Sequence, residues 1–143
     1  MNGYLAMKWL TLTIVMCCSI AGLSQDFSKH RWSNRLLVIL TNDANSPLVN
    51  KQLKELENNR QAVEERRLLT YFVTPERYKL LSEDEQWQTE SSFAEYTLSK
   101  PFEVLLIGLD GDIKQRESGV FEASKLISII DSMPMRRAEM RGN

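Results

Sequence analysis

The sequence contains very little cysteine and histidine. Its two cysteines, Cys17 and Cys18, are adjacent and lie in an apolar stretch near the N-terminus, and its only histidine is His30. A zinc-like metal site needs several such ligands to converge, and a serine–histidine–aspartate triad would have to use His30 as its base. We therefore expect neither a metal nor a cofactor, and no residue is assigned a catalytic role.

Long runs of one charge are also absent from the body of the chain. The 143 residues include 18 Lys or Arg and 19 Asp or Glu, which gives a formal net charge of −1 at pH 7. Proteins that bind nucleic acid cluster Lys and Arg against phosphates, so we expect no nucleic-acid partner. Hydrophobic residues make up 43% of the chain, which is typical of a globular protein with one core.

The first 24 residues have the pattern of a secretory signal peptide. Lys8 precedes an apolar run at 9–16, and the small residues Gly22 and Ser24 follow it. A positive start, an apolar centre and a small-residue cleavage site are the three parts of such a signal. We predict cleavage after Ser24, which would leave a mature domain of residues 25–143 in the periplasm or outside the cell.

Two alternatives stay open for this N-terminal segment. The stretch 9–23 could remain uncleaved as a membrane anchor, although it is shorter than the roughly 20 residues that span a bilayer. Cys17 could instead be lipidated, although Met16 is larger than the residue that usually precedes such a cysteine. If the segment is cleaved, the domain has no cysteine, and thus no thiolate nucleophile of its own.

The mature chain begins with a strand-helix-strand pattern. A continuous apolar run at 35–40 is typical of a central strand that is covered on both faces. Ser46 and Pro47 then favour the start of a helix, and a second strand is predicted at 68–73. The predicted helix carries apolar residues on one face, namely Val49, Leu53, Leu56 and Val63. This order predicts a right-handed crossover between two parallel strands.

The second half of the chain predicts a hairpin and a helix. A third strand is expected at 102–109, and Asp110-Gly111 favours a tight turn with positive φ at both central residues. The fourth strand is expected at 112–117, followed by a helix at 120–132.

Pro134 should end or kink this last helix. The segment 76–100 is more polar, with Phe93, Tyr96 and Leu98 as the apolar side of a short helix. The order of elements predicts an α/β, thioredoxin-like fold, in which helices flank a central mixed four-stranded sheet.

The chain resembles the bacterial family called domain of unknown function 4174. The resemblance covers about residues 31–141, and five segments carry it: 35–40, 52–56, 65–69, 106–114 and 130–136. It implies a thioredoxin-like fold distantly related to peroxiredoxins, and export to the cell envelope. It implies no established activity.

The chain departs from the active relatives of this superfamily at one place. Thioredoxins and peroxiredoxins have a nucleophilic cysteine in the loop or first helical turn after the first strand, where residues 41–47 here read Thr-Asn-Asp-Ala-Asn-Ser-Pro. Pro101 lies near the position of the thioredoxin cis-proline, but we do not transfer that geometry. We therefore predict a non-catalytic binding or adaptor module in the envelope. The alternative is an accessory oxidoreductase or a peroxiredoxin-related enzyme of unknown substrate.

The loop after the first strand supplies the first candidate binding residues, because ligands often bind beyond the carboxyl ends of parallel strands. These residues are Thr41, Asn42, Asp43, Asn45 and Ser46. The alternative is structural, since Asn and Asp form turns and Ser caps helices. A small polar ligand would fit the first interpretation.

Arg136 and Arg137 are the second candidate, as contacts for an envelope protein. They lie beside Met133 and Met135, which are soft apolar side chains suited to an interface. In the alternative interpretation the two methionines close the core and the arginines favour a helix C-terminus.

Overall fold

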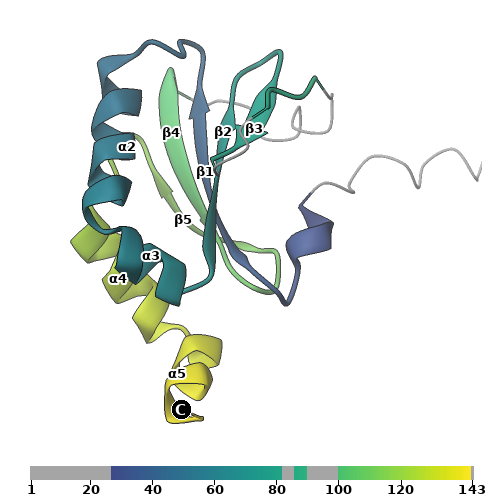
Figure 1. Cartoon of the computed structure of the whole chain (residues 1–143), viewed down its shortest axis with the longest axis vertical. Coiled ribbons are helices and arrows are strands. Elements are labelled where there is room, and N and C mark those ends of the chain that lie inside the picture. Colours follow the sequence, from purple (N-terminus) through teal and green to yellow (C-terminus); the bar gives the residue numbers. More distant parts are fainter. Residues whose placement is uncertain (1–26, 82–85, 90–99, 143) are drawn as a thin grey trace, which may run out of the picture.

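The computed structural model describes residues 27–81, 86–89 and 100–142 (Figure 1). The described elements are the 3-10 turn η2 (Ser28–His30), the strands β1 (Arg35–Thr41), β2 (Leu68–Val73), β3 (Tyr78–Leu80), β4 (Phe102–Ile107) and β5 (Ile113–Glu117), and the helices α2 (Pro47–Asn58), α3 (Arg60–Glu65), α4 (Ala123–Ser132) and α5 (Pro134–Arg141). The predicted signal segment, both cysteines and the predicted short helix with Phe93, Tyr96 and Leu98 lie outside the described residues.

The strands form one mixed sheet in the order β3-β2-β1-β4-β5. β1 and β2 are parallel, whereas the pairs β1–β4, β2–β3 and β4–β5 are antiparallel. The predicted parallel first half and hairpin second half are therefore confirmed. The sheet has five strands rather than the predicted four, because the polar segment 76–100 contributes the short edge strand β3.

β1 lies in the middle of the sheet and is buried along its whole length. Its side chains alternate between two apolar clusters, with Leu37 and Ile39 in one and Leu36, Val38 and Leu40 in the other. This double burial explains the absence of polar alternation in the run 35–40. Each such side chain contributes about 1.5–3 kcal/mol when it is fully buried.

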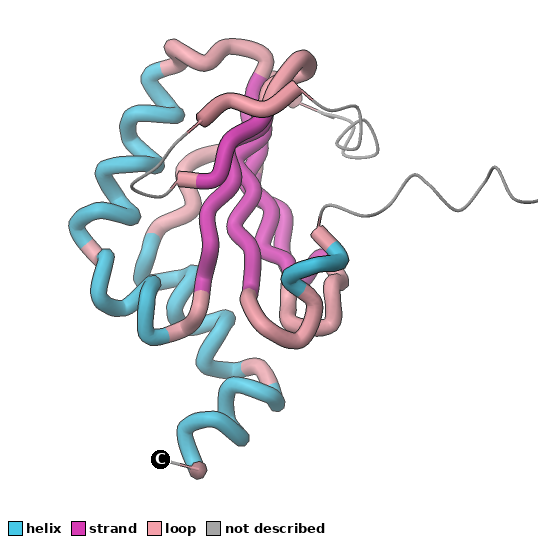
Figure 2. Tube along the Cα trace, turned by 45° about the vertical axis from the view of Figure 1, so that its right-hand side comes forward, coloured by secondary structure: helices cyan, strands magenta, loops and turns pink. Residues whose placement is uncertain are grey.

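The helices α2, α3 and α4 form a layer against one face of the sheet (Figures 1 and 2). Val49 and Leu56 of α2 and Leu126 and Ile130 of α4 join the apolar cluster on that face. The predicted helix start is confirmed, since the Ser46 side chain accepts a hydrogen bond from the Leu48 backbone N–H.

The helical segment after Ser46 is interrupted, which the sequence pattern did not predict. Asn59 adopts φ −120° and ends α2, and the remaining turns form α3. Its side-chain amide donates to the carbonyl of Glu55, which is one of the last carbonyls of α2. Asn commonly makes such local bonds in competition with the helix, so one predicted helix becomes two.

Aromatic side chains gather on the opposite face of the sheet. The Tyr71 hydroxyl lies 2.7 Å from His30 Nε2 of η2, and the Phe27 ring packs edge-on against Tyr71 at 5.1 Å between centroids. These contacts tie the start of the described chain to β2. None of the helices in the described ranges has the length and apolar character needed to cross a membrane.

The β4–β5 hairpin differs from the predicted two-residue turn. Its loop spans 108–112 and closes through a bond from the Gly108 N–H to the Asp112 carbonyl, at 2.9 Å. Of the loop residues only Gly111 has a positive φ, of 86°, so the expectation of positive φ at Asp110 was wrong. The pairing shifts register next to Ile107, and this shift gives room for the longer loop.

Two polar side chains of α2 connect it to the segment that leads into α4. Gln52 is fully buried, and its amide donates to the Phe121 carbonyl at 3.2 Å while accepting from the Phe121 N–H at 2.6 Å. The Glu55 carboxylate accepts from the Ala123 N–H at 3.0 Å. α4 therefore begins at Ala123, three residues later than predicted, where α2 supplies the acceptor for its first N–H.

Candidate functional site

The loop that follows β1 contains the first group of predicted site residues. Thr41 is buried, and its Oγ1 lies 3.1 Å from the Asp43 N–H and 3.2 Å from the Pro101 carbonyl. The Asn42 N–H also bonds the Pro101 carbonyl, at 3.3 Å. These bonds fasten the loop to the start of β4. The described peptide bonds, that of Pro101 included, are all trans.

Two further polar side chains in this loop bind the backbone. The Asp43 carboxylate accepts from the Asn45 N–H at 2.9 Å, and Ser46 Oγ accepts from the Leu48 N–H at 3.3 Å. Asp43 therefore forms a turn and Ser46 a helix cap, while the Asn42 and Asn45 side chains are exposed. A ligand for this loop remains a prediction.

His30 cannot act as a base toward Ser46. His30 precedes β1 whereas Ser46 follows it, and a seven-residue strand separates its two ends by about 20 Å. Among the residues that the structure describes, no group of three or more His, Cys, Asp or Glu side chains could hold a metal ion.

The opposite end of β1 carries a cluster of arginines and carboxylates that the sequence did not reveal. Arg35 is the first residue of β1 and only 1% exposed. Its guanidinium donates to the Arg66 carbonyl at 2.9 Å and to the two Glu139 oxygens at 3.1 and 3.4 Å. Its Nε is buried without a hydrogen-bond partner. Glu139 belongs to α5, so this contact attaches the last helix to the first strand.

Asp131 is the second carboxylate of the cluster. Arg66 donates to both of its oxygens, at 2.9 and 2.6 Å, which is the strong bidentate geometry of a guanidinium and a carboxylate. Arg136 donates to Asp131 at 3.4 Å, to Glu139 at 3.2 Å and to the Glu65 carbonyl at 3.3 Å. We call Arg35, Arg66, Asp131, Arg136 and Glu139 the arginine network.

The network lowers the pKa values of both its carboxylates. For Asp131 the largest cause is the hydrogen bonding from Arg66, which outweighs the opposing effect of burial on the pKa. For Glu139 the largest single effect is desolvation, which raises the pKa. The hydrogen bonds and charges of Arg35 and Arg136 together lower the pKa by more than desolvation raises it. Both carboxylates are therefore held in their charged form.

The family described as Domain of unknown function (DUF4174) matches residues 26–139. The chain belongs to this family. The match includes both ends of β1 and all five residues of the arginine network. No curated protein matches the sequence.

A solved structure supports the fold of this family member. The reduced 2-Cys peroxiredoxin of Plasmodium vivax aligns with 79% of the chain and 83% of its own chain, at a TM-score of 0.52 and 12% sequence identity. At this identity the likeness shows the fold alone. The predicted thioredoxin-like α/β fold is thus confirmed.

The two arginines predicted as partner contacts in this DUF4174 domain have different environments. Arg136 is 14% exposed and faces the body of the domain as part of the network, whereas the Arg137 side chain is exposed. Both lie in the first half of α5 rather than at a helix C-terminus. Met133 packs against the core, but Met135 is 40% exposed, so only one methionine closes the core as the alternative required.

Sequence reasoning missed four residues of the network, namely Arg35, Arg66, Asp131 and Glu139. One signal was available: an apolar run that begins with a charged residue raises the question of where that charge is neutralised. The segments 65–69 and 130–136, which carried the family resemblance, meet in this network.

Proposed function

We propose that this protein is exported and that its thioredoxin-like domain is a non-catalytic binding module, which docks an acidic protein partner through α5. The observation that carries the proposal is the construction of α5. None of its eight residues is buried, and Figure 1 shows it extending past the sheet at the end where β1 begins.

The sequence of α5 is unfavourable for a helix that has no partner. It has no side-chain cap and no acidic residue in its first turn, although a helix N-terminus favours negative charge. Arg137 and Arg141 are spaced i,i+4, a spacing at which like charges repel. A local conflict of this kind is most often found at a functional surface, and a carboxylate of a partner would relieve it.

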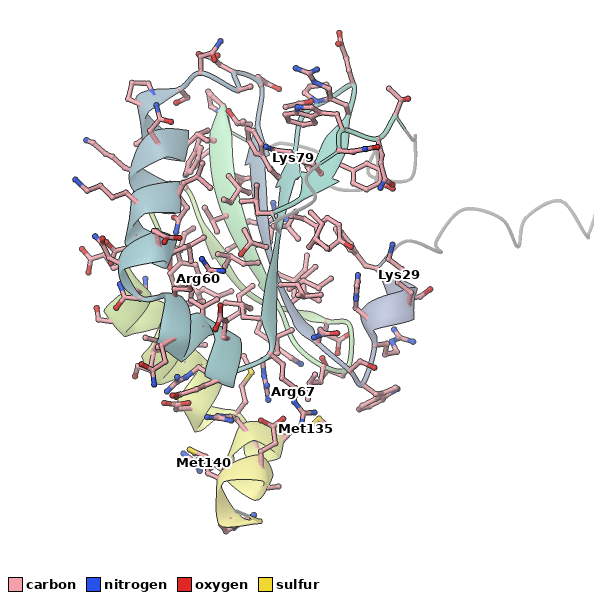
Figure 3. All side chains as sticks on the ribbon, in the orientation of Figure 1. Lys29, Arg60, Arg67, Lys79, Met135 and Met140 are labelled. Atoms are coloured by element: carbon pink, nitrogen blue, oxygen red, sulfur yellow. The ribbon has the colours of Figure 1, made fainter. Side chains whose placement is uncertain are left out.

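The exposed side chains around α5 fit an interface. Met135 and Met140 are 40% and 46% exposed and project from opposite sides of the helix (Figure 3). Arg67 is a third exposed cation near α5. Its carbonyl accepts a hydrogen bond from the Arg35 N–H, which places Arg67 beside the start of β1. Met and Arg are enriched at protein interfaces. We call Arg67, Met135, Arg137, Met140 and Arg141 the α5 surface.

The signal-like first 24 residues support export. Export would also account for a domain of residues 25–143 that has no cysteine, since nothing in it could form an unwanted disulfide in an oxidising compartment. N-terminal sequencing and intact mass of the protein from its native cell test this part. A mature N-terminus at Gln25 is expected, and a chain that retains residues 1–24 in the cytoplasm would contradict it.

Site-specific photocrosslinking tests the docking. A photoreactive amino acid at Met140 should capture one acidic protein in the native cell, whereas the same amino acid at exposed Lys51 should not. The captured protein is then purified and titrated with the domain. We expect Arg137→Glu/Arg141→Glu to weaken binding about tenfold or more, and added salt to do the same.

A matched charge control accompanies this titration. Lys51→Glu/Lys100→Glu changes the net charge equally at two exposed positions away from α5 and should leave the affinity unchanged. Equal losses in the two double variants would mean that only overall charge matters, and would refute docking at the α5 surface. Turnover of peroxide or reduction of insulin by residues 25–143 alone would refute the non-catalytic assignment.

A further inference from the structure

A groove of about 770 Å³ lies between the helices α2 and α3 and the strands β2 and β3, of which β3 is the edge strand. Its floor is apolar: Leu53 and Val63 come from the helices, and Leu68 and Leu81 from the strand side. Leu53, Val63 and Leu81 are only partly buried against the core. Sites that hold one small molecule are mostly apolar and span about 300–1,000 Å³, so the groove is large enough for one.

Charged side chains line the rim of the groove. Lys54 and Arg60 lie on the helical wall and Lys79 on the strand wall, together with the carboxylates of Glu57 and Glu64. Arg60 pairs with Glu64 at 2.9 Å. Among the described residues of the rim there are three cations and two carboxylates, and Figure 3 shows Arg60 on the helical side and Lys79 on the strand side.

The position of Lys79 follows from the register of the edge strand. Lys79 pairs with Phe72, and Phe72 belongs to the apolar cluster on the helical face, so Lys79 also projects to that face. Its Nζ lies 5.2 Å from the centre of the Trp87 ring, and the Trp87 ring lies 5.4 Å from that of Phe72. A cation and a tryptophan therefore meet beside the apolar floor.

From this arrangement we propose that the groove binds an anionic amphiphile, a molecule with one acyl-like apolar chain and a carboxylate. The chain lies along Leu53, Val63 and Leu81, and the carboxylate lies between Arg60 and Lys79. The apolar floor supplies the affinity, and the cations set the orientation and the preference for an anion. This site is separate from the α5 surface and does not depend on it.

Titration with a fluorescent fatty acid tests the site. The probe is 11-(dansylamino)undecanoic acid, with the matching dansylated alcohol as a neutral analogue, added to residues 25–143. We expect saturable binding of the acid with a blue-shifted dansyl emission and weaker binding of the alcohol. Energy transfer from Trp87 to the dansyl group, measured in a Trp32→Phe background, reports that the probe is bound in the neighbourhood of Trp87.

Two variants separate the head group from the tail. Arg60→Gln/Lys79→Gln should weaken the acid about tenfold or more, the scale of one hydrogen bond to a charged group, and leave the alcohol unchanged. Val63→Trp should fill the floor and weaken both probes. Lys51→Gln, on α2 but outside the groove, is the control and should change neither.

Equal affinities for acid and alcohol, or an acid affinity unaffected by Arg60→Gln/Lys79→Gln, would overturn the anionic head group. Absence of saturable binding to the wild-type domain would overturn the site. Since these measurements do not use α5, their failure leaves the docking proposal unaffected.

Discussion

Gln52 is a fully buried polar residue in a helix that otherwise packs apolar side chains inward. Its amide makes two hydrogen bonds with the backbone of Phe121. It therefore satisfies both the N–H and the carbonyl of Phe121, as the backbone of a neighbouring strand would. The amphipathic pattern of 47–63 places Gln52 beside the apolar stripe but cannot show that it will be buried. That information lies 69 residues away, in a segment without regular structure.

Gln52→Ala should lower the free energy of unfolding by about 2–4 kcal/mol. The variant leaves the Phe121 N–H and carbonyl without partners and creates a cavity, each of which costs about 1–3 kcal/mol in a buried site. Urea unfolding followed by circular dichroism measures the loss. Lys51→Ala, one residue earlier and exposed, should change stability by less than about 0.5 kcal/mol. Similar values for both variants would contradict the role of Gln52.

Ser46 occupies a helix cap at which related folds place chemistry, so a thiol introduced there should be activated. We expect Ser46→Cys to titrate below the ordinary cysteine pKa of about 8.5, because a helix N-terminus stabilises the thiolate. The pH dependence of alkylation by iodoacetamide measures this pKa.

Ser132→Cys is the matched control for that experiment, because Ser132 is exposed and closes α4 at its C-terminus. Its thiol should titrate at or above the ordinary value. If both thiols titrate alike, the N-terminus of α2 does not stabilise a thiolate at position 46, and the prediction is wrong.

At the scale of elements, the arginine network replaces apolar packing for α5. Its two carboxylates have ordinary pKa values of 3.8 and 4.5, which the folded state lowers. A pKa that is lower in the folded than in the unfolded state stabilises the protein above the unfolded value, and this stabilisation is lost as the pH falls through the folded value. The attachment of α5 should therefore weaken in acid, below about pH 4.

Asp131→Asn tests this pH dependence. At pH 7 the variant should be less stable than the wild type in urea unfolding, because Arg66 loses its charged bidentate partner. The difference should shrink as the pH falls below about 4 and on through the lowered pKa of folded Asp131, because the wild type then loses its charged carboxylate. Asp112→Asn, at a carboxylate that is 74% exposed, should show little difference at any pH. A constant difference for Asp131→Asn would contradict the electrostatic explanation.

The elements that the sequence predicted are those with strong local signals. The apolar runs of β1, β2 and β4, the Ser46 cap and the apolar face of α4 all depend on neighbouring residues and were correct. β3 has three residues and exists because its backbone pairs with Tyr71–Val73. α5 was missed because it is attached to the sheet by the ion pair of Glu139 with the distant Arg35. Local patterns show neither feature.

At the scale of the whole molecule, the thioredoxin-like order of elements was predictable, and the spatial grouping of candidate sites was not. Thr41 to Ser46 and Arg136 to Arg137 lie at opposite ends of β1. They cannot form one site, since the strand separates them. Only the path of α4 and α5 back to the start of β1 decides this placement (Figure 2).

Removal of residues 134–143 should destabilise the domain by about 3–5 kcal/mol, because it leaves the buried Arg35 guanidinium without its carboxylate. The measurement is again urea unfolding of residues 25–133 against residues 25–143. Arg35→Met in the truncated chain should recover part of the loss, since the uncompensated charge is then gone. No recovery would mean that α5 stabilises the domain by a mechanism other than neutralising Arg35.

Arg35 and Glu139 are 104 residues apart in sequence, and this separation affects how the chain matures. β1 carries a charge that is neutralised only when α5 has been synthesised and has packed against the start of that strand. Until then the sheet would have to bury an uncompensated guanidinium. A chain that stops before α5 would therefore bury Arg35 without its carboxylate, and we expect it to open and to be cleaved by proteases more readily than the full domain.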